Sequence, residues 1–301
     1  MRRTKIILWS VISALLLALL VTLFLLPGGL GISLPFGSSY LYDASGFSAF
    51  EGGELPVGTT RAIEIDWMSG NVVLLPSEGE NIRIEETSSS SLEDEKSRMH
   101  IKQENGILSI KYAACGRIPS GLSKKLTVHI PTSLVPDSLT VHAVSAELDL
   151  SEIRAGAVRL TTISGGIRLS NLQGTSLSLD TTSGKAEISA LAVDRLEFKS
   201  VSGALSLQGK ATSVTADTVS GDVRLSFDSE NLAQITVSST SGDVTLLLPE
   251  DTGFSASLDS VSGSFSGNFD ARLSGGVYTF GDGSVRITVD TVSGDLRIEK
   301  K

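Results

Sequence analysis

Seven Ser-Gly pairs recur along the second half of the chain, and their residue types could do chemistry. Serine can act as a nucleophile, and a neighbouring aspartate can act as a base or as a cation ligand. The glycines of the pairs are Gly165, Gly184, Gly203, Gly221, Gly242, Gly263 and Gly294. Aspartate follows three of them, at Asp222, Asp243 and Asp295, whereas Gly, Lys, Ala and Ser follow the other four. The repeated element therefore does not require the carboxylate.

The partners that this chemistry needs are missing from the repeats. A nucleophilic serine needs a base beside it. The three histidines, His100, His129 and His142, lie outside the Ser-Gly pairs. Calcium takes about six to eight oxygen ligands, more than one carboxylate per repeat provides. We predict that the pairs are turns, that the protein is not an enzyme, and that it has no catalytic residue, cofactor or metal site.

The spacing of the pairs indicates which elements carry them. Successive glycines are 19, 19, 18, 21, 21 and 31 residues apart, and Ala146 takes the place of glycine one repeat before Gly165. Apolar residues alternate on both sides of each pair, but their phase changes at the pair. The chain must bend there if both flanks are to bury their apolar side chains. We expect the glycine to supply a positive φ and the serine to point inward, where its hydroxyl pairs with backbone groups.

A period of about twenty residues, with two short strands and a bend in each unit, is typical of stacked repeats. The predicted fold is all-β: a parallel β-solenoid preceded by one N-terminal transmembrane helix. An antiparallel β-sandwich would also have short alternating strands, but it does not explain the recurring bend. A separate copy at Ser69-Gly70 predicts an irregular β cap layer over residues 55–135, with regular coils over 136–301. The charged residues 297–301 are expected to protect the last exposed strand.

The N-terminus differs from the rest of the chain. Residues 6–26 carry no charge, and Arg2, Arg3 and Lys5 precede them. Such a segment is long enough to cross a bilayer as a helix, and the positive-inside rule places its N-terminus in the cytoplasm. We expect residues 1–30 to form a cytoplasmic stub and a single-pass membrane anchor, residues 31–54 a linker, and the remainder an extracytoplasmic domain. A cleaved signal peptide is the alternative, although its apolar region is usually shorter.

The charge of the chain limits its partners. Asp and Glu total 34 against 25 Lys and Arg, a formal net charge of −9. The basic residues are not clustered as phosphate binding requires, so nucleic acid is not an expected partner. An envelope protein, a surface polymer or a second copy of the chain fits better.

Two features are candidate interaction surfaces. The residue before each serine should face outward and form a β-branched stripe when the coils stack; it comprises Val144, Ile163, Thr182, Val201, Val219, Thr240, Val261 and Val292. The second feature is the long interval before Gly294, since insertions in repeat proteins form loops that often bind partners. Its candidate residues are Arg272, Tyr278 and Phe280. Strand propensity alone could explain the stripe, and a plain hairpin could explain the insertion.

The anchor, the segment "IEIDWMSGNV", the strand "KLTVHIP" and the serial "TVSGDVRL" units resemble the bacterial putative-adhesin family, a β-strand-repeat domain of unknown function. The resemblance covers about residues 55–300 and implies a membrane-anchored protein of the cell envelope, with a role in adhesion or in envelope stress. Ala146 and the long last interval depart from the pattern. The expected function is a non-enzymatic scaffold for adhesion or protein interaction. The alternatives are a self-assembling scaffold of the bactofilin kind and, less favoured by the residues, a carbohydrate-active β-helix enzyme.

Overall fold

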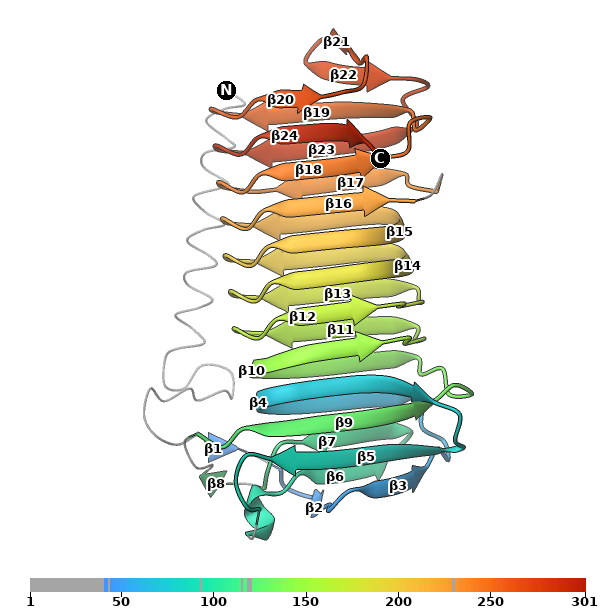
Figure 1. Ribbon diagram of the computed structural model, residues 1–301, viewed down its shortest axis with the longest axis vertical. Helices are drawn as coiled ribbons and strands as arrows, with labels where there is room; N and C mark the ends of the chain where they lie inside the picture. The colour runs from blue at the N-terminus through green and yellow to red at the C-terminus, as the bar shows by residue number, and fades with distance from the viewer. Residues whose placement is uncertain (1–40, 43, 93, 115, 118–120, 229–230) are drawn as a thin grey trace.

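A computed structural model describes residues 41–42, 44–92, 94–114, 116–117, 121–228 and 231–301 (Figure 1). The predicted anchor within residues 1–30 lies outside the described residues, as does most of the predicted linker. In the described part of the chain, no helix combines the length and the apolar character needed to span a bilayer.

The described residues are almost entirely β-strands. The N-terminal elements are β1 (Leu41–Tyr42), β2 (Ser48–Ala49), β3 (Gly53–Pro56), β4 (Ala62–Ser77), β5 (Asn81–Ser88), the 3-10 helix η1 (Glu95–Ser97), β6 (His100–Glu104), β7 (Ile107–Lys111), β8 (Gly116–Arg117) and β9 (Lys124–Pro131). The middle elements are β10 (Ser138–Ser151), β11 (Ala157–Thr162), β12 (Ile167–Ser170), β13 (Ser176–Thr181), β14 (Ala186–Ser200), β15 (Leu205–Thr218) and β16 (Val223–Phe227). The C-terminal elements are β17 (Gln234–Ser238), β18 (Val244–Leu248), β19 (Phe254–Ser260), β20 (Phe265–Gly267), β21 (Arg272–Ser274), β22 (Val277–Phe280), β23 (Val285–Thr291) and β24 (Leu296–Lys300).

Strand β4, the strands from β10 to β20, and β23 and β24 stack in parallel as a flattened solenoid (Figure 1). Like residues form ladders along its axis; Leu160, for example, lies beside Leu179, which lies beside Phe198. Two facing layers of strands enclose the core, and the Ser-Gly corners line one edge. The residues at alternate strand positions are buried, as the period-two pattern requires. The prediction of an all-β parallel solenoid is therefore confirmed.

The serine of each corner is not inside, in contrast to the prediction. Ser164, Ser183 and their counterparts are exposed. Ser183 Oγ donates a hydrogen bond to the Ile163 carbonyl of the adjacent coil, at 3.3 Å. The inward hydroxyl belongs to the residue two positions earlier, such as Thr181, whose Oγ1 accepts from Gly184 N–H at 2.8 Å. The alternation stops at the corner because the chain turns there, so extending it by two residues, from Thr181 to Ser183, predicted the wrong side for the serine.

The corner glycines are required by close packing and not by a positive φ. None of the seven is among the positive-φ residues of the described chain. A Cβ on Gly184 would lie 2.0 Å from the Gly165 carbonyl oxygen, and one on Gly221 would lie 2.0 Å from that of Gly203. No side chain fits at such a distance, so glycine is the residue that allows successive corners to stack.

Both ends of the solenoid have a rearranged chain order. The chain enters at β4, leaves to form the antiparallel strands β5 and β6 with β9 beside them, and returns on the other side of β4 at β10. At the other end, β23 lies between β17 and β19, and β24 lies between β18 and β20. The charged C-terminal residues are thus on an interior strand, which corrects the prediction of an exposed last strand. The outermost coil is residues 254–267.

Candidate functional site at the open end of the solenoid

The predicted stripe is present along the corner edge, but most of it is packed. Val201, Val219 and Val292 are half-buried, and their carbonyl oxygens accept hydrogen bonds from the corner of the next coil. Val261 differs, with 47% of its surface exposed, because it belongs to the outermost coil. The stripe therefore offers an apolar contact at its C-terminal end more than along its length.

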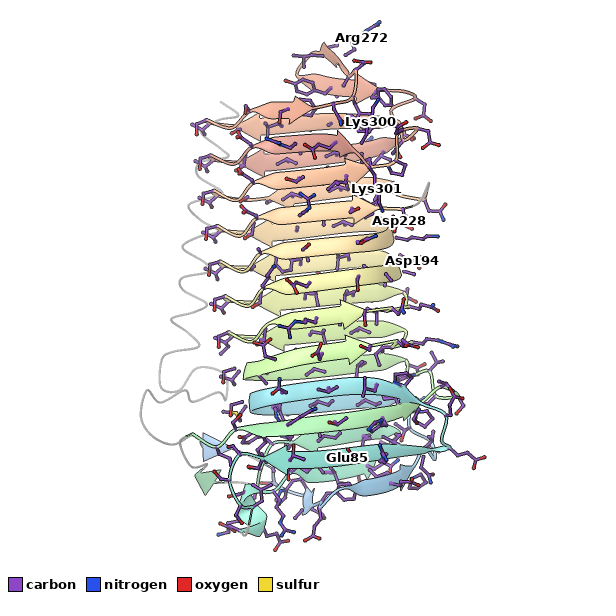
Figure 2. All side chains as sticks on the ribbon, in the orientation of Figure 1. Glu85, Asp194, Asp228, Arg272, Lys300 and Lys301 are labelled. Carbon is purple, nitrogen blue, oxygen red and sulfur yellow. The ribbon has the colours of Figure 1, made fainter. Side chains whose placement is uncertain are left out.

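The predicted insertion forms an antiparallel hairpin, β21–β22, beside that coil. Arg272 is the first residue of β21 and lies at the extreme end of the solenoid, away from the cap (Figure 2). Leu273 beside it is 57% exposed. Strand β22 pairs in antiparallel fashion with the first half of β19, from Phe254 to Ser257. The structure thus brings the insertion residues beside Phe254–Ser257 and Phe265 of the outermost coil.

Aromatic rings close the end of the core. Tyr278 stacks on Phe265, with ring centroids 3.7 Å apart. Phe280 packs edge-on against Phe269 at 4.9 Å, and both contact Phe254. Phe254 is fully buried, whereas the other four rings are only half-buried. Such amphipathic and apolar rings are the side chains that interaction surfaces favour.

Beyond β22, the outermost coil has an unpaired edge. Within the described residues, β20 pairs only with β24, and Leu258–Ser260 pair only with β23. The Val261 carbonyl and the Phe265 N–H have no hydrogen-bond partner there. We call residues 258–267 the open edge. An edge of this kind can accept a further strand.

Two carboxylates lie side by side next to the open edge. Asp259 and Asp290 are adjacent in register, and neither makes an ion pair with any described residue. Burial, and secondly the charge of Asp259, raise the pKa of Asp290 above its usual range. The open edge therefore has an unbalanced negative charge.

The corner aspartates have a structural role in these contacts. Asp222 Oδ1 accepts from Asp243 N–H at 3.0 Å, and Asp243 Oδ1 accepts from Asp295 N–H at 2.9 Å. Asp295 accepts in turn from the Ser264 N–H and hydroxyl, at 2.7 and 2.9 Å, which lowers its pKa. Each carboxylate thus satisfies a backbone amide of the next coil. Among the described residues, no group of three or more His, Cys, Asp or Glu side chains is placed to hold a metal.

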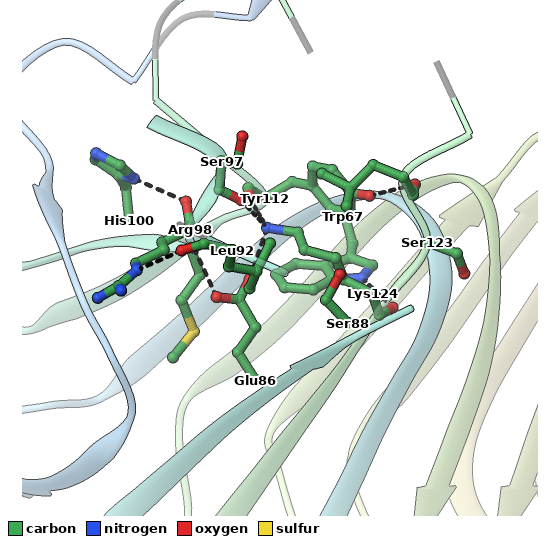
Figure 3. A network of polar contacts seen from close by, with 12 residues as sticks. Trp67, Glu86, Ser88, Leu92, Ser97, Arg98, His100, Tyr112, Ser123 and Lys124 are labelled. Atoms are coloured by element: carbon green, nitrogen blue, oxygen red, sulfur yellow. Dashed lines mark hydrogen bonds and ion pairs between the residues drawn. The ribbon is translucent and has the colours of Figure 1, made fainter. Parts of the chain in front are cut away.

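The N-terminal cap contains a buried ion pair that the sequence analysis missed (Figure 3). The Lys124 side chain is fully buried, and its Nζ lies 2.6 Å from Glu86 Oε1 and 2.9 Å from the Ser97 carbonyl oxygen, with the Tyr112 carbonyl as a third acceptor. The ammonium also lies 4.0 Å from the centre of the Tyr112 ring. Burial lowers the pKa of Lys124 and raises that of Tyr112.

All three donor positions of the Lys124 ammonium are occupied, so Lys124 fastens β5, η1 and the residue after β7 to β9 and has no free donor for a substrate. A signal for it was present in the sequence. The alternation that buries Leu126 and Val128 also places Lys124 inside, and that of Ile82 and Ile84 places Glu86 inside.

A shallow polar trough of about 650 Å³ lies on the outer face of β12, β14, β15 and β16. Arg168 lies in it within 3.9 Å of both Asp149 and Glu187. Its carboxylates are paired with a guanidinium at an exposed surface, where such contacts are weak. The trough does not include Arg272, Tyr278, Phe280 or any stripe valine.

Similar solved structures include a "putative cell adhesion protein" from Clostridium sporogenes, 12% identical over 83% of this chain and 98% of its own, with a TM-score of 0.24. A "putative adhesin" from Bacteroides fragilis is 14% identical over 82% and 95%, with a TM-score of 0.42. A "putative lipid binding protein" from Parabacteroides distasonis is 15% identical over 86% and 99%, with a TM-score of 0.41. Likenesses this distant do not carry function from one protein to another.

No curated protein matches the chain. The family model described as Toastrack DUF4097 matches residues 60–299, which include every coil of the solenoid and most of its cap. This match confirms the family resemblance expected from the serial Ser-Gly units. The chain belongs to the Toastrack DUF4097 family.

Proposed function

We propose that the protein is a non-enzymatic binding scaffold, held in the cell membrane by residues 6–26 and presenting its solenoid outside the cytoplasm. The partner is engaged at the C-terminal end, in adhesion or in maintenance of the cell envelope. The observation that carries this proposal is the open edge with its exposed Val261, together with the exposed Leu273 of the hairpin. Exposed apolar side chains next to an unpaired strand are typical of interaction sites.

Other features support a scaffold over an enzyme. The corner serines bind backbone carbonyls, the corner aspartates bind backbone amides, and Lys124 is saturated by acceptors. The chain order places the open edge at the C-terminal tip of the solenoid, opposite the cap (Figure 1). The distance from the cap leaves this tip accessible to a partner.

The proposal is tested by cross-linking intact cells that express the full chain. The double variant Val261→Asp/Leu273→Asp should lose specific adducts, because charge at the open end opposes apolar contact. Val135→Asp is the matched control, since Val135 is equally exposed, at 54%, but lies between β9 and β10; it should keep the adducts. Equal adducts from both variants would contradict the placement of the site.

The orientation has a separate test. Protease added outside intact cells should degrade the solenoid, whereas complete protection would exclude the extracytoplasmic placement.

A further inference from the structure

In each interior coil, backbone groups of the corner form hydrogen bonds with the corner of the next coil. At the open edge, the equivalent backbone groups have no partner in the described chain. In the coil beneath it, the Val292 carbonyl accepts from the N–H and the hydroxyl of Ser262, at 3.1 and 3.4 Å. Leu296 N–H donates to the Ser264 carbonyl at 2.9 Å. The equivalent groups of the open edge are the Val261 carbonyl and the Phe265 N–H, which have no partner in the described chain. A further corner would supply both partners.

The apolar side chains of the open edge are also incompletely covered. Leu258 continues the column of Val289, and Phe265 continues that of Leu296. Val289 and Leu296 have no exposed surface, whereas Leu258 and Phe265 are half-buried. The Tyr278 ring already stacks on Phe265, so an added strand would remove more apolar surface from water chiefly by placing an inward apolar residue over Leu258.

The corner itself selects the residue that can stack on it. At every interior corner a Cβ on the stacked glycine would lie within 2.1 Å of the carbonyl oxygen beneath, and for Gly263 on Gly294 the distance is 2.0 Å. The Gly263 carbonyl faces the open end in the same way. Only glycine can therefore occupy the next position.

Charge selects a second residue. Asp259 and Asp290 end one outward column of the solenoid. Lower in the same column, Lys199 lies between Asp180 and Asp217. Like charges directly opposite each other destabilise a sheet, and an interposed cation relieves them. A Lys or Arg above Asp259 would repeat the arrangement around Lys199.

We propose that the open edge binds an extended segment of a partner protein, which adds as one more parallel coil with Gly over Gly263 and Lys or Arg over Asp259. This inference rests on the proposed function and specifies its partner. A second copy is the less suitable occupant, because Lys124 of the cap lies beside Gly70 and covers the opposite end of the ladder. Stacking copies head to tail would require the cap to open.

The chain contains a probe with the required pattern. Residues 198–207, "FKSVSGALSL", would align with residues 258–267, placing Lys199 over Asp259 and Gly203 over Gly263. A fluorescent peptide of this sequence is titrated with the purified full-length protein in detergent, and binding is followed by anisotropy. We expect saturable binding. Peptides with Gly203→Val and Lys199→Glu serve as controls, and the first should bind about tenfold more weakly or worse because of the overlap with the Gly263 carbonyl.

A charge exchange tests the register. The Lys199→Glu peptide should bind about threefold more weakly than the parent peptide to the natural protein, and the order should reverse for the Asp259→Lys protein. Circular dichroism establishes that this surface variant folds. No saturable binding, or equal binding of the Gly203→Val peptide, would overturn the proposal. Oligomers in sedimentation that Val261→Asp dissolves would also overturn it, in favour of a second copy, and the cellular cross-linking experiment stands independently of these results.

Discussion

The two ends of the solenoid solve the same problem differently. Any stack of parallel coils ends in two rows of unpaired backbone groups. At the N-terminal end, β7 and β9 pair with β4, the antiparallel strands β6 and β5 lie beyond them, and Lys124 and Glu86 fasten this cover from inside. At the C-terminal end, β22 covers only the first half of β19 and leaves the open edge. The first end is closed, and the second can accept a further strand.

The two ends nevertheless share one feature of chain order. At each end, the inner coil is built from a segment that lies nearer to a chain terminus than the strands that pair with it on its outer side. The outermost C-terminal coil precedes β23 and β24 in the sequence but lies outside them. Fraying from the C-terminus must therefore pull a strand from between two neighbours. The folded structure of the open edge depends on this interior strand. Removing the strand should therefore have the largest effect on stability.

Deleting residues 296–301 should cost at least about 4 kcal/mol of unfolding free energy, because Leu296 and Ile298 are fully buried and each contributes about 2 kcal/mol. Hydrogen exchange should show lost protection in both β18 and β20. The control Lys301→Ala changes an exposed terminal side chain and should stay within about 0.5 kcal/mol. A mild effect of the deletion would mean that the C-terminal strand lies at the edge after all.

At the closed end, Lys124→Met should destabilise the protein by about 3–5 kcal/mol, since Glu86 would keep a buried charge without its partner. Urea unfolding measures the loss. Lys125→Met is the matched control, because the neighbouring lysine is exposed, and it should change stability by less than about 0.5 kcal/mol. Equal effects of the two substitutions would remove the distinction between a fastened and an unfastened end.

A smaller difference should separate interior corners from the corner of the open edge. Gly221→Ala forces a Cβ to within 2.0 Å of the Gly203 carbonyl between two fixed coils, and overpacking of this kind costs about 2–3 kcal/mol. Gly263→Ala meets the Gly294 carbonyl at the same 2.0 Å, but no described coil lies above it. The outermost coil can shift outward, so we expect about 1 kcal/mol. Thermal unfolding of both variants measures the two losses of stability. Equal losses would indicate that the open end is as rigid as the interior.

Alternation predicted the solenoid because it follows burial, which dominates strands such as β11 and β13. It failed at the corner serines because a turn has no period of two. The order of the last two coils could not be predicted, since Gly263 and Gly294 belong to the same kind of Ser-Gly corner. In the structure, the hairpin β21–β22 pairs in antiparallel fashion with the first half of β19, on the side that β23 leaves free. The alternation of apolar residues in β9 and β5 placed Lys124 and Glu86 in the core of the cap. Predicting the pair required accepting charged residues at such buried positions.

The smallest expected effect concerns the uncompensated charge at the open edge. Burial and Asp259 raise the folded-state pKa of Asp290 above its usual value of 3.8. The ionised carboxylate therefore penalises folding at neutral pH, and the penalty disappears as the pH falls through the raised pKa towards 3.8. Asp290→Asn should stabilise the protein at pH 7 by a few tenths of a kcal/mol, a modest gain because the site is half in solvent. Urea unfolding at pH 7 and pH 4 should show the gain only at the higher pH. A gain in stability that persists at pH 4 would indicate an effect of packing and not of charge. The case for a cationic partner above Asp259 would then be weaker.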